Sequence, residues 1–89
     1  MSFMLIHHRV KDYRKWREVF DSLADFRKQN GELSAKVYRA ADDPNHLTLL
    51  LAWDSLEKAR RFAISEELAE AMKHAGVEGI PTFYFLNEA

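Results

Sequence analysis

The sequence predicts an α+β fold in which a four-stranded antiparallel sheet carries two helices on one face. Four short segments are apolar or alternating, as strands are, and two longer segments place apolar residues at steps of three and four. Their order is strand, helix, strand, strand, helix, strand. Because each helix joins strands that no tight turn connects, right-handed crossovers place both helices on the same face.

The first half of the chain predicts a strand, a helix and a second strand. Residues 3–10 are mostly apolar, which favours a largely buried strand. Asp12 can cap a helix that ends at Gly31. Its apolar side chains share one face: Tyr13, Trp16, Val19, Phe20, Leu23 and Phe26. Residues 33–40 alternate between apolar and polar side chains, as expected for a half-exposed or edge strand.

The second half begins with a hairpin. Residues 42–45 have the composition of a turn, and residues 46–53 form a near-continuous apolar run. The length of this run and its flanking residues favour a central strand paired with the preceding one.

A second helical region and a last strand complete the chain. Residues 54–57 carry a capping pattern, Ser65 offers a second helix start, and Gly76 can end the helix. Residues 80–86 are typical of a strand, and Pro81 favours an edge position because proline cannot donate to a neighbouring strand. The complete order predicts one ferredoxin-like βαββαβ sandwich spanning residues 1–89, since a chain of this length builds one core.

Composition excludes several classes of partner. The 13 Lys and Arg against 14 Asp and Glu give a net charge of −1, which provides no field for a nucleic acid or an anionic membrane. The absence of cysteine removes disulfides and thiolate chemistry. The longest apolar run is too short to span a bilayer, and the first residues lack the basic region followed by an apolar stretch that is typical of a signal peptide. We therefore expect a cytoplasmic protein.

Both faces of the predicted sheet are apolar. Three strands contribute to both: Phe3 and Leu5 lie opposite Met4 and Ile6, Leu50 and Ala52 lie opposite Leu47, Leu49, Leu51 and Trp53, and Phe83 and Phe85 lie opposite Ile80, Tyr84 and Leu86. Two small helices cannot cover both faces, and an antiparallel sheet normally shows water a polar face. We expect a homodimer packed sheet to sheet. The alternative is that some apolar residues are simply exposed.

Three stretches of the chain carry a resemblance to a known family. They are the first strand, from Phe3-Met4 to His8-Arg9-Val10, the junction Trp53-Asp54-Ser55-Leu56-Glu57, and the following helix with Phe62, Ser65 and a closing glycine. They resemble the dimeric α/β-barrel proteins that include antibiotic-biosynthesis-monooxygenase-like domains. The resemblance covers essentially the whole chain and implies two sheets that pack into a barrel. It leaves the activity open, because the fold hosts monooxygenases, isomerases, cyclases and haem enzymes.

The haem-degrading branch of this family is not matched. In haem-degrading members, the resemblance implies an asparagine on the first strand, a tryptophan in the second helix and an iron-ligating histidine ten residues later. The matching positions hold His8 (or His7 under a one-residue shift), Phe62 and Met72. His74 lies two residues beyond the ligand position, about 200° around a helix. His7 and His8 point to opposite faces and cannot share a metal. We expect no haem, metal or other cofactor.

His8 is the candidate catalytic residue. It shares its face of the strand with Met4, Ile6 and Val10, which places it beneath the helices. An imidazole there can take or relay a proton near neutral pH. The alternative is a core or interface histidine held by one hydrogen bond.

Five aromatic side chains and one methionine are candidate ligand-binding residues. Rings can grip an aromatic ligand by stacking, and methionine makes a pocket adaptable. They are Trp16, Tyr38, Trp53, Phe62, Met72 and Tyr84. Ordinary core packing is the alternative for each. The basic residues Lys58, Arg60 and Arg61 have glutamates nearby, so we expect a solvated helix face rather than an anion site.

Three functions remain open from the sequence. The first is a cofactor-independent monooxygenase acting on a small aromatic or quinol-type substrate, where the substrate carbanion reduces oxygen and the protein supplies a pocket, orientation and a base. The second is a non-catalytic homodimeric binder of small apolar ligands. The third is another dimeric-barrel activity, such as isomerisation or cyclisation.

Overall fold

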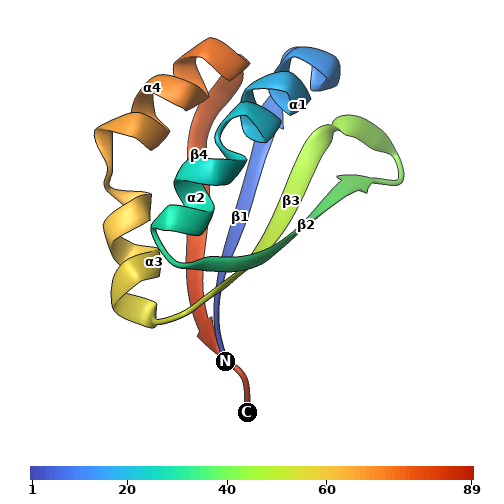
Figure 1. Cartoon of the computed structure of the whole chain (residues 1–89). Coiled ribbons are helices and arrows are strands. Elements are labelled where there is room, and N and C mark those ends of the chain that lie inside the picture. Colours follow the sequence, from blue (N-terminus) through green and yellow to red (C-terminus); the bar gives the residue numbers. More distant parts are fainter.

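The chain folds into a four-stranded antiparallel sheet with all of its helices on one face (Figure 1). This computed structural model describes residues 1–89. The elements in chain order are β1 (Ser2–Val10), α1 (Tyr13–Ser22), α2 (Ala24–Gln29), β2 (Glu32–Ala40), β3 (Asp43–Trp53), α3 (Leu56–Ala63), α4 (Glu66–Ala75) and β4 (Val77–Asn87).

The predicted ferredoxin-like sandwich is confirmed. The strand order is β2-β3-β1-β4, so the apolar run in β3 is central, and the alternating strand β2 and the proline-containing strand β4 form the edges. The predicted helix signals also act as expected. Ser55 and Ser65 accept hydrogen bonds from backbone N–H groups in the first turns of α3 and α4, and Gly76 ends α4 with φ +76°.

Three predicted boundaries are wrong. The last strand, expected from residue 80, already begins at Val77. The helix expected from Asp12 to Gly31 is broken at Leu23 into α1 and α2. The hydroxyl of Ser22 donates to the Val19 carbonyl over 2.6 Å, and this bond competes with the backbone ladder where the axis changes. The turn expected at 42–45 is shorter, because β3 already begins at Asp43.

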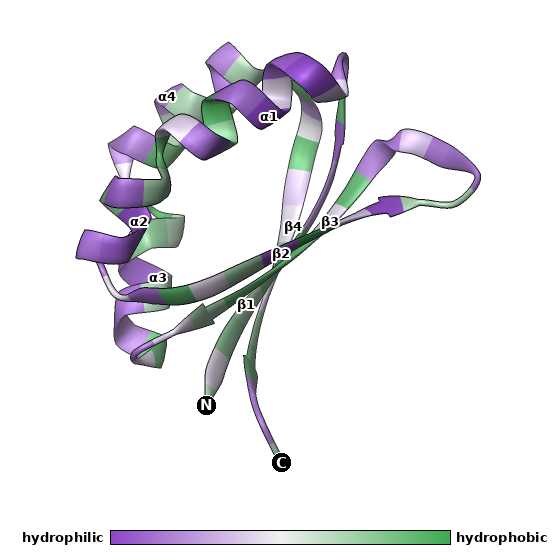
Figure 2. Ribbon diagram, turned by 45° about the vertical axis from the view of Figure 1, so that its right-hand side comes forward, coloured by the Kyte–Doolittle hydropathy of each residue, from purple (hydrophilic) through white to green (hydrophobic).

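The hydrophobic core lies between the sheet and the helices. Alternate residues of β1 are buried there, namely Met4, Ile6, His8 and Val10, and the helices cover them with Trp16, Ala59, Phe62, Leu68 and Ala75. The other face of the sheet has no covering layer (Figure 2). The alternation along β1 therefore sends neighbouring residues into two different environments.

A bulge distorts the edge of the sheet beside His8. His7 pairs with Thr82 and Arg9 pairs with Glu78, so three residues of β4, from Gly79 to Pro81, lie opposite the single residue His8. Gly79 has φ +71°, a conformation that strongly favours glycine. Bulges of this kind often re-aim side chains next to functional sites.

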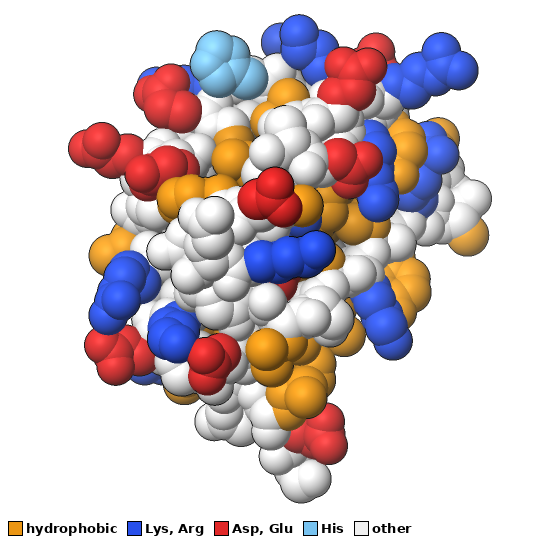
Figure 3. All heavy atoms as spheres, in the orientation of Figure 1, with side chains coloured by type: hydrophobic (Ala, Val, Ile, Leu, Met, Phe, Trp, Pro, Cys, Tyr) orange, Lys and Arg blue, Asp and Glu red, His pale blue; other side chains and the backbone are white.

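No helix is both long and apolar enough to cross a membrane. On the helix layer, acidic and basic side chains are interspersed rather than gathered by sign (Figure 3).

Candidate functional site

A small internal cavity lies between the sheet and the helices. Its volume is about 50 Å³, and nine of its eleven lining residues are hydrophobic. The two others are His8 from β1 and Arg27 from α2. An apolar cavity with a few convergent polar groups is the usual form of a small-molecule site.

His8 is the buried titratable group of this cavity. His8 is only 7% exposed to solvent. Neither of its ring nitrogens, Nδ1 or Nε2, forms a hydrogen bond with another group of the protein. The Trp16 ring lies 5.9 Å away between centroids. Burial lowers the pKa of His8 to about 4, with smaller contributions from the charges of His7 and His46. The imidazole is therefore neutral at pH 7.

Arg27 is held by a buried ion pair. Its Nε donates to Glu32 Oε2 over 2.7 Å, and its Nη1 donates to the Phe20 carbonyl over 2.6 Å. Both charged side chains are almost fully enclosed, and the guanidinium stacks on the Phe20 ring at 3.7 Å. Burial raises the pKa of the Glu32 carboxyl against the opposing effect of Arg27. The pair fixes α2 to the start of β2 and keeps a positive charge in the cavity wall.

The structure brings together four of the seven predicted site residues. Trp16, Phe62 and Met72 line the cavity with His8. Trp53 is buried and its ring lies 5.1 Å from the Phe62 ring between centroids, but it does not line the cavity. Tyr38 and Tyr84 lie on the uncovered face of the sheet, about half exposed and away from His8.

The sequence prediction missed Arg27 as a site residue. The available signal was its spacing, because Arg27 follows Phe20 by seven residues and Leu23 by four, which places it on the apolar face of the helical segment. A charge on such a face requires a partner, and Glu32 lies five residues further on.

Three side chains that line the cavity also line hollows at the surface. Leu23 also lines a hollow between α1 and α4, Phe62 lines one beside α2 and α3, and Met72 lines one between α4 and β4. Leu23 lies at the break between two helices, where the backbone is least constrained by helical hydrogen bonds.

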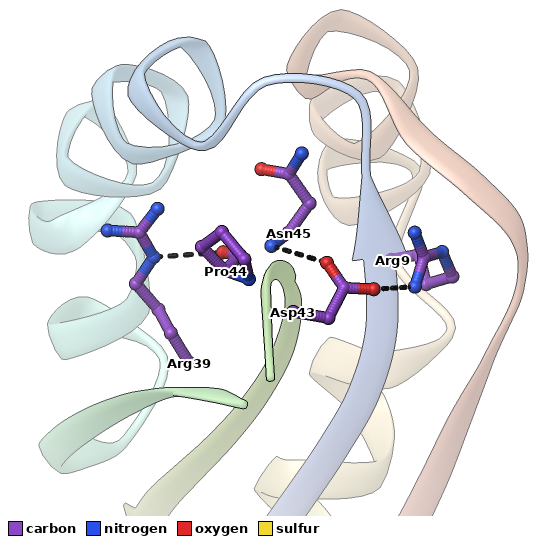
Figure 4. A network of polar contacts seen from close by, with 5 residues as sticks. All are labelled: Arg9, Arg39, Asp43, Pro44 and Asn45. Atoms are coloured by element: carbon purple, nitrogen blue, oxygen red, sulfur yellow. Dashed lines mark hydrogen bonds and ion pairs between the residues drawn. The ribbon is translucent and has the colours of Figure 1, made fainter. Parts of the chain in front are cut away.

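The uncovered face of the sheet carries two other histidines, His7 and His46. His7 Nδ1 lies 2.9 Å from Thr48 Oγ1, and the His7 and His46 rings are 4.2 Å apart between centroids. At the end of this face, Arg9 pairs with Asp43 in the β2–β3 turn region, where Asp43 also accepts from the Asn45 N–H (Figure 4). No group of three or more His, Cys, Asp or Glu side chains is arranged to hold a metal.

Fold and site together define the class of protein: a ferredoxin-like α+β domain with an internal apolar cavity that contains one buried histidine. A family model described as antibiotic biosynthesis monooxygenase matches residues 11–74, and the chain belongs to this family. No curated protein matches its sequence.

Solved structures share the fold at low sequence identity. A crystal structure of an antibiotic biosynthesis monooxygenase superposes with TM-score 0.75 at 13% identity, covering 100% of this chain and 99% of that one. A conserved protein from Methanosarcina mazei gives 0.77 at 15%, covering 100% and 94%. SnoaB from Streptomyces nogalater, a cofactor-independent oxygenase, gives 0.74 at 14%, covering 99% and 94%.

Proposed function

We propose that this protein is a small oxygenase that oxidises an acidic phenol or quinol with molecular oxygen, using His8 to take the hydroxyl proton. The observation that carries this proposal is the state of His8. Both of its ring nitrogens are buried without a partner in the protein, at the wall of a cavity whose other lining residues, except Arg27, are hydrophobic. A buried polar group of this kind requires a polar partner, and a substrate hydroxyl would provide one. The similarity in fold to the cofactor-independent oxygenase SnoaB supports this choice of chemistry.

The lowered pKa of His8 restricts the substrate. The neutral imidazole has a free lone pair at pH 7, so it can accept a proton without first losing one. With a pKa of about 4 it is a weak base, and proton transfer is favoured only from an acidic hydroxyl. The phenolate formed beside the imidazolium would stabilise it by charge attraction.

The proposed reaction balances without an added reductant. The hydroxyl proton passes to His8, and a ring carbon of the phenolate that bears a hydrogen forms a C–O bond to O₂. The imidazolium returns the proton to the resulting peroxide. The O–O bond then breaks as that ring carbon loses its hydrogen, which releases water and leaves a quinone. One oxygen atom of O₂ enters the product, the other leaves as water, and the substrate supplies all four electrons.

The size of the cavity requires a wall to move. A cavity of roughly 150 Å³ lined by aliphatic and aromatic side chains accepts benzene. The cavity beside His8 is about 50 Å³ and admits no ring as it stands. We propose entry past Leu23, Phe62 or Met72, because each of these side chains lines both the cavity and a surface hollow.

The small cavity also favours the second candidate function, binding without chemistry. A site that opens only when an apolar ligand displaces a side chain can serve as a binding site alone. The two functions differ in oxygen consumption, and a panel of quinols and phenols followed with an oxygen electrode separates them. Oxygen uptake with quinone formed in equal amount supports the oxygenase. Binding of the same compounds with no uptake supports the binder and overturns the oxygenase.

We also propose that the protein is a homodimer joined through the uncovered face of the sheet. Apolar side chains remain on that face and along its edge. Tyr84 is 54% exposed and Leu86 is 39% exposed, and Ile80 in the edge bulge is 94% exposed. Large apolar side chains that remain exposed in this way are typical of an interaction site in a folded protein. A second copy offers the same surface, and a two-fold axis makes it self-complementary.

The dimer is tested by light scattering at micromolar concentration with a pair of variants. Tyr84→Asp places a charge on the uncovered face and should increase the dimer dissociation constant at least ~10-fold, because burying an unpaired charge costs several kcal/mol. Glu67→Asp on α4 is the control and should remain dimeric. A wild-type protein that scatters as a monomer would refute the dimer.

A further inference from the structure

A surface groove, larger than the His8 cavity, lies between α3 and β4. Its volume is about 530 Å³, within the range of small-molecule sites. The apolar part is formed by Ala63 and Ile64 at the end of α3 and by Phe83 and Phe85 on β4. It shares no lining residue with the His8 cavity. Ala63 leaves the space open, because a larger side chain at this position would fill it.

Arg60 gives this groove an unpaired positive charge. The neighbouring Arg61 is paired with Glu57 over 3.0 Å, and Lys58 is paired with Asp54 over 2.7 Å. Arg60 has no carboxylate partner, and its guanidinium lies 5.6 Å from the centre of the Phe85 ring. The three basic residues of α3 are therefore not equivalent, although the sequence predicts a single solvated face.

We propose that this groove binds an amphipathic anion, a small molecule with an apolar tail and one carboxylate. Phe83, Phe85 and Ile64 would contact the tail, and Arg60 at the rim would pair with the carboxylate. Ile64 is 85% exposed, so a tail lying against it would remove apolar surface from water. Arginine suits this role because its planar guanidinium can bind both carboxylate oxygens.

Charge complementarity selects this occupant over a neutral apolar one. Glu57 already neutralises Arg61, so a ligand carboxylate would compensate the one guanidinium left without a partner. A neutral ligand of the same shape would gain the apolar contacts and leave Arg60 unchanged. The difference in affinity between the two ligands is therefore the property to measure.

The experiment titrates octanoate and, separately, octanol into the full-length protein and follows backbone amides by NMR. Octanoate should saturate with a dissociation constant near ~1 mM or below, as expected for a ligand of about ten heavy atoms. The shifts should centre on Ala63, Phe83 and Phe85. Octanol should bind more weakly at the same place.

Three variants separate the groove from other surfaces. Arg60→Gln should weaken octanoate binding about 3- to 10-fold, the scale of one charge-assisted contact, and leave octanol binding unchanged. Arg14→Gln removes an exposed arginine from α1 and should not change either affinity. Ala63→Leu should fill the groove and weaken both ligands, with the fold checked by thermal melting. Equal affinity for octanoate in wild type and Arg60→Gln, or shifts centred elsewhere, would overturn the proposal.

Discussion

The two faces of the sheet place adjacent histidines of β1 in opposite circumstances. On the helix side, His8 is buried, bonds no protein group and has a pKa lowered to about 4 by desolvation. On the other side, His7 is exposed and lies near Thr48 and His46. His7 and His8 are adjacent in the sequence, but successive residues of a strand point to opposite faces of the sheet. Their side chains therefore differ in burial and in hydrogen-bond partners.

The ion pairs of the two faces show the same contrast. Arg27–Glu32 is enclosed by α2, β2 and the Phe20 ring, whereas Arg9–Asp43 lies at the solvent-exposed end of the sheet. Because the helix side excludes water, a charged group that lost its partner there would lower the stability of the fold. The helix side therefore holds one buried ion pair in a fixed position at the cavity, and the other side keeps its ion pair in contact with water.

The largest expected effect concerns these two ion pairs. Arg27→Met should lower the free energy of unfolding by about 3–5 kcal/mol, because Glu32 would remain buried without its partner. Arg9→Met leaves Asp43 in contact with water and should melt close to the wild-type temperature. Urea denaturation of both variants provides the comparison. Equal losses in the two variants would contradict the difference between the faces.

A second prediction uses the pKa of His8. The unfolded chain binds this proton near pH 6.5 and the folded chain only near pH 4, so the His8 contribution to stability is lost as the pH falls through that window. The free energy of unfolding should decrease by about 3 kcal/mol between pH 7 and pH 4 because of His8.

The variant His8→Leu isolates this contribution, since it should lack that part of the pH dependence. His74→Gln, at an exposed position on α4, should keep it. Denaturation curves for all three proteins at several pH values give the measurement. Identical pH profiles for wild type and His8→Leu would show that His8 is not buried as described.

The smallest expected effect is on the uncovered face. Thr48→Val removes the hydroxyl beside His7, and water can replace it there. The free energy of unfolding should change by no more than about 1 kcal/mol, which is the net value of one such hydrogen bond. A loss as large as that of Arg27→Met would mean that the uncovered face is as tightly enclosed as the helix side.

The fold could be predicted from the sequence because each element carries a strong local signal. Ser55, Ser65 and Gly76 mark helix ends chemically, and the apolar run of β3 has no plausible place except the centre of a sheet. The break at Leu23 had no such signal, since neither glycine nor proline lies near it and the apolar spacing continues through it.

The candidate site was predictable only in part. Alternation along β1 predicts that His8 lies beneath the helices, and helical spacing predicts Trp16 and Phe62 above it. The Arg27–Glu32 pair and the size of the cavity depend on how α2 docks on the sheet. That docking is a tertiary property, and no local pattern encodes a distance between side chains on different elements.

We propose that chemistry occurs on the helix side of β1 and association on the other side. The most direct test compares His8→Ala with His7→Ala in oxygen uptake on a substrate found in the quinol and phenol panel. His8→Ala should lose about 10²- to 10⁴-fold in turnover, the usual scale for a general base, and His7→Ala should keep the parental rate. Parental turnover in His8→Ala, or the large loss in His7→Ala instead, would contradict the account.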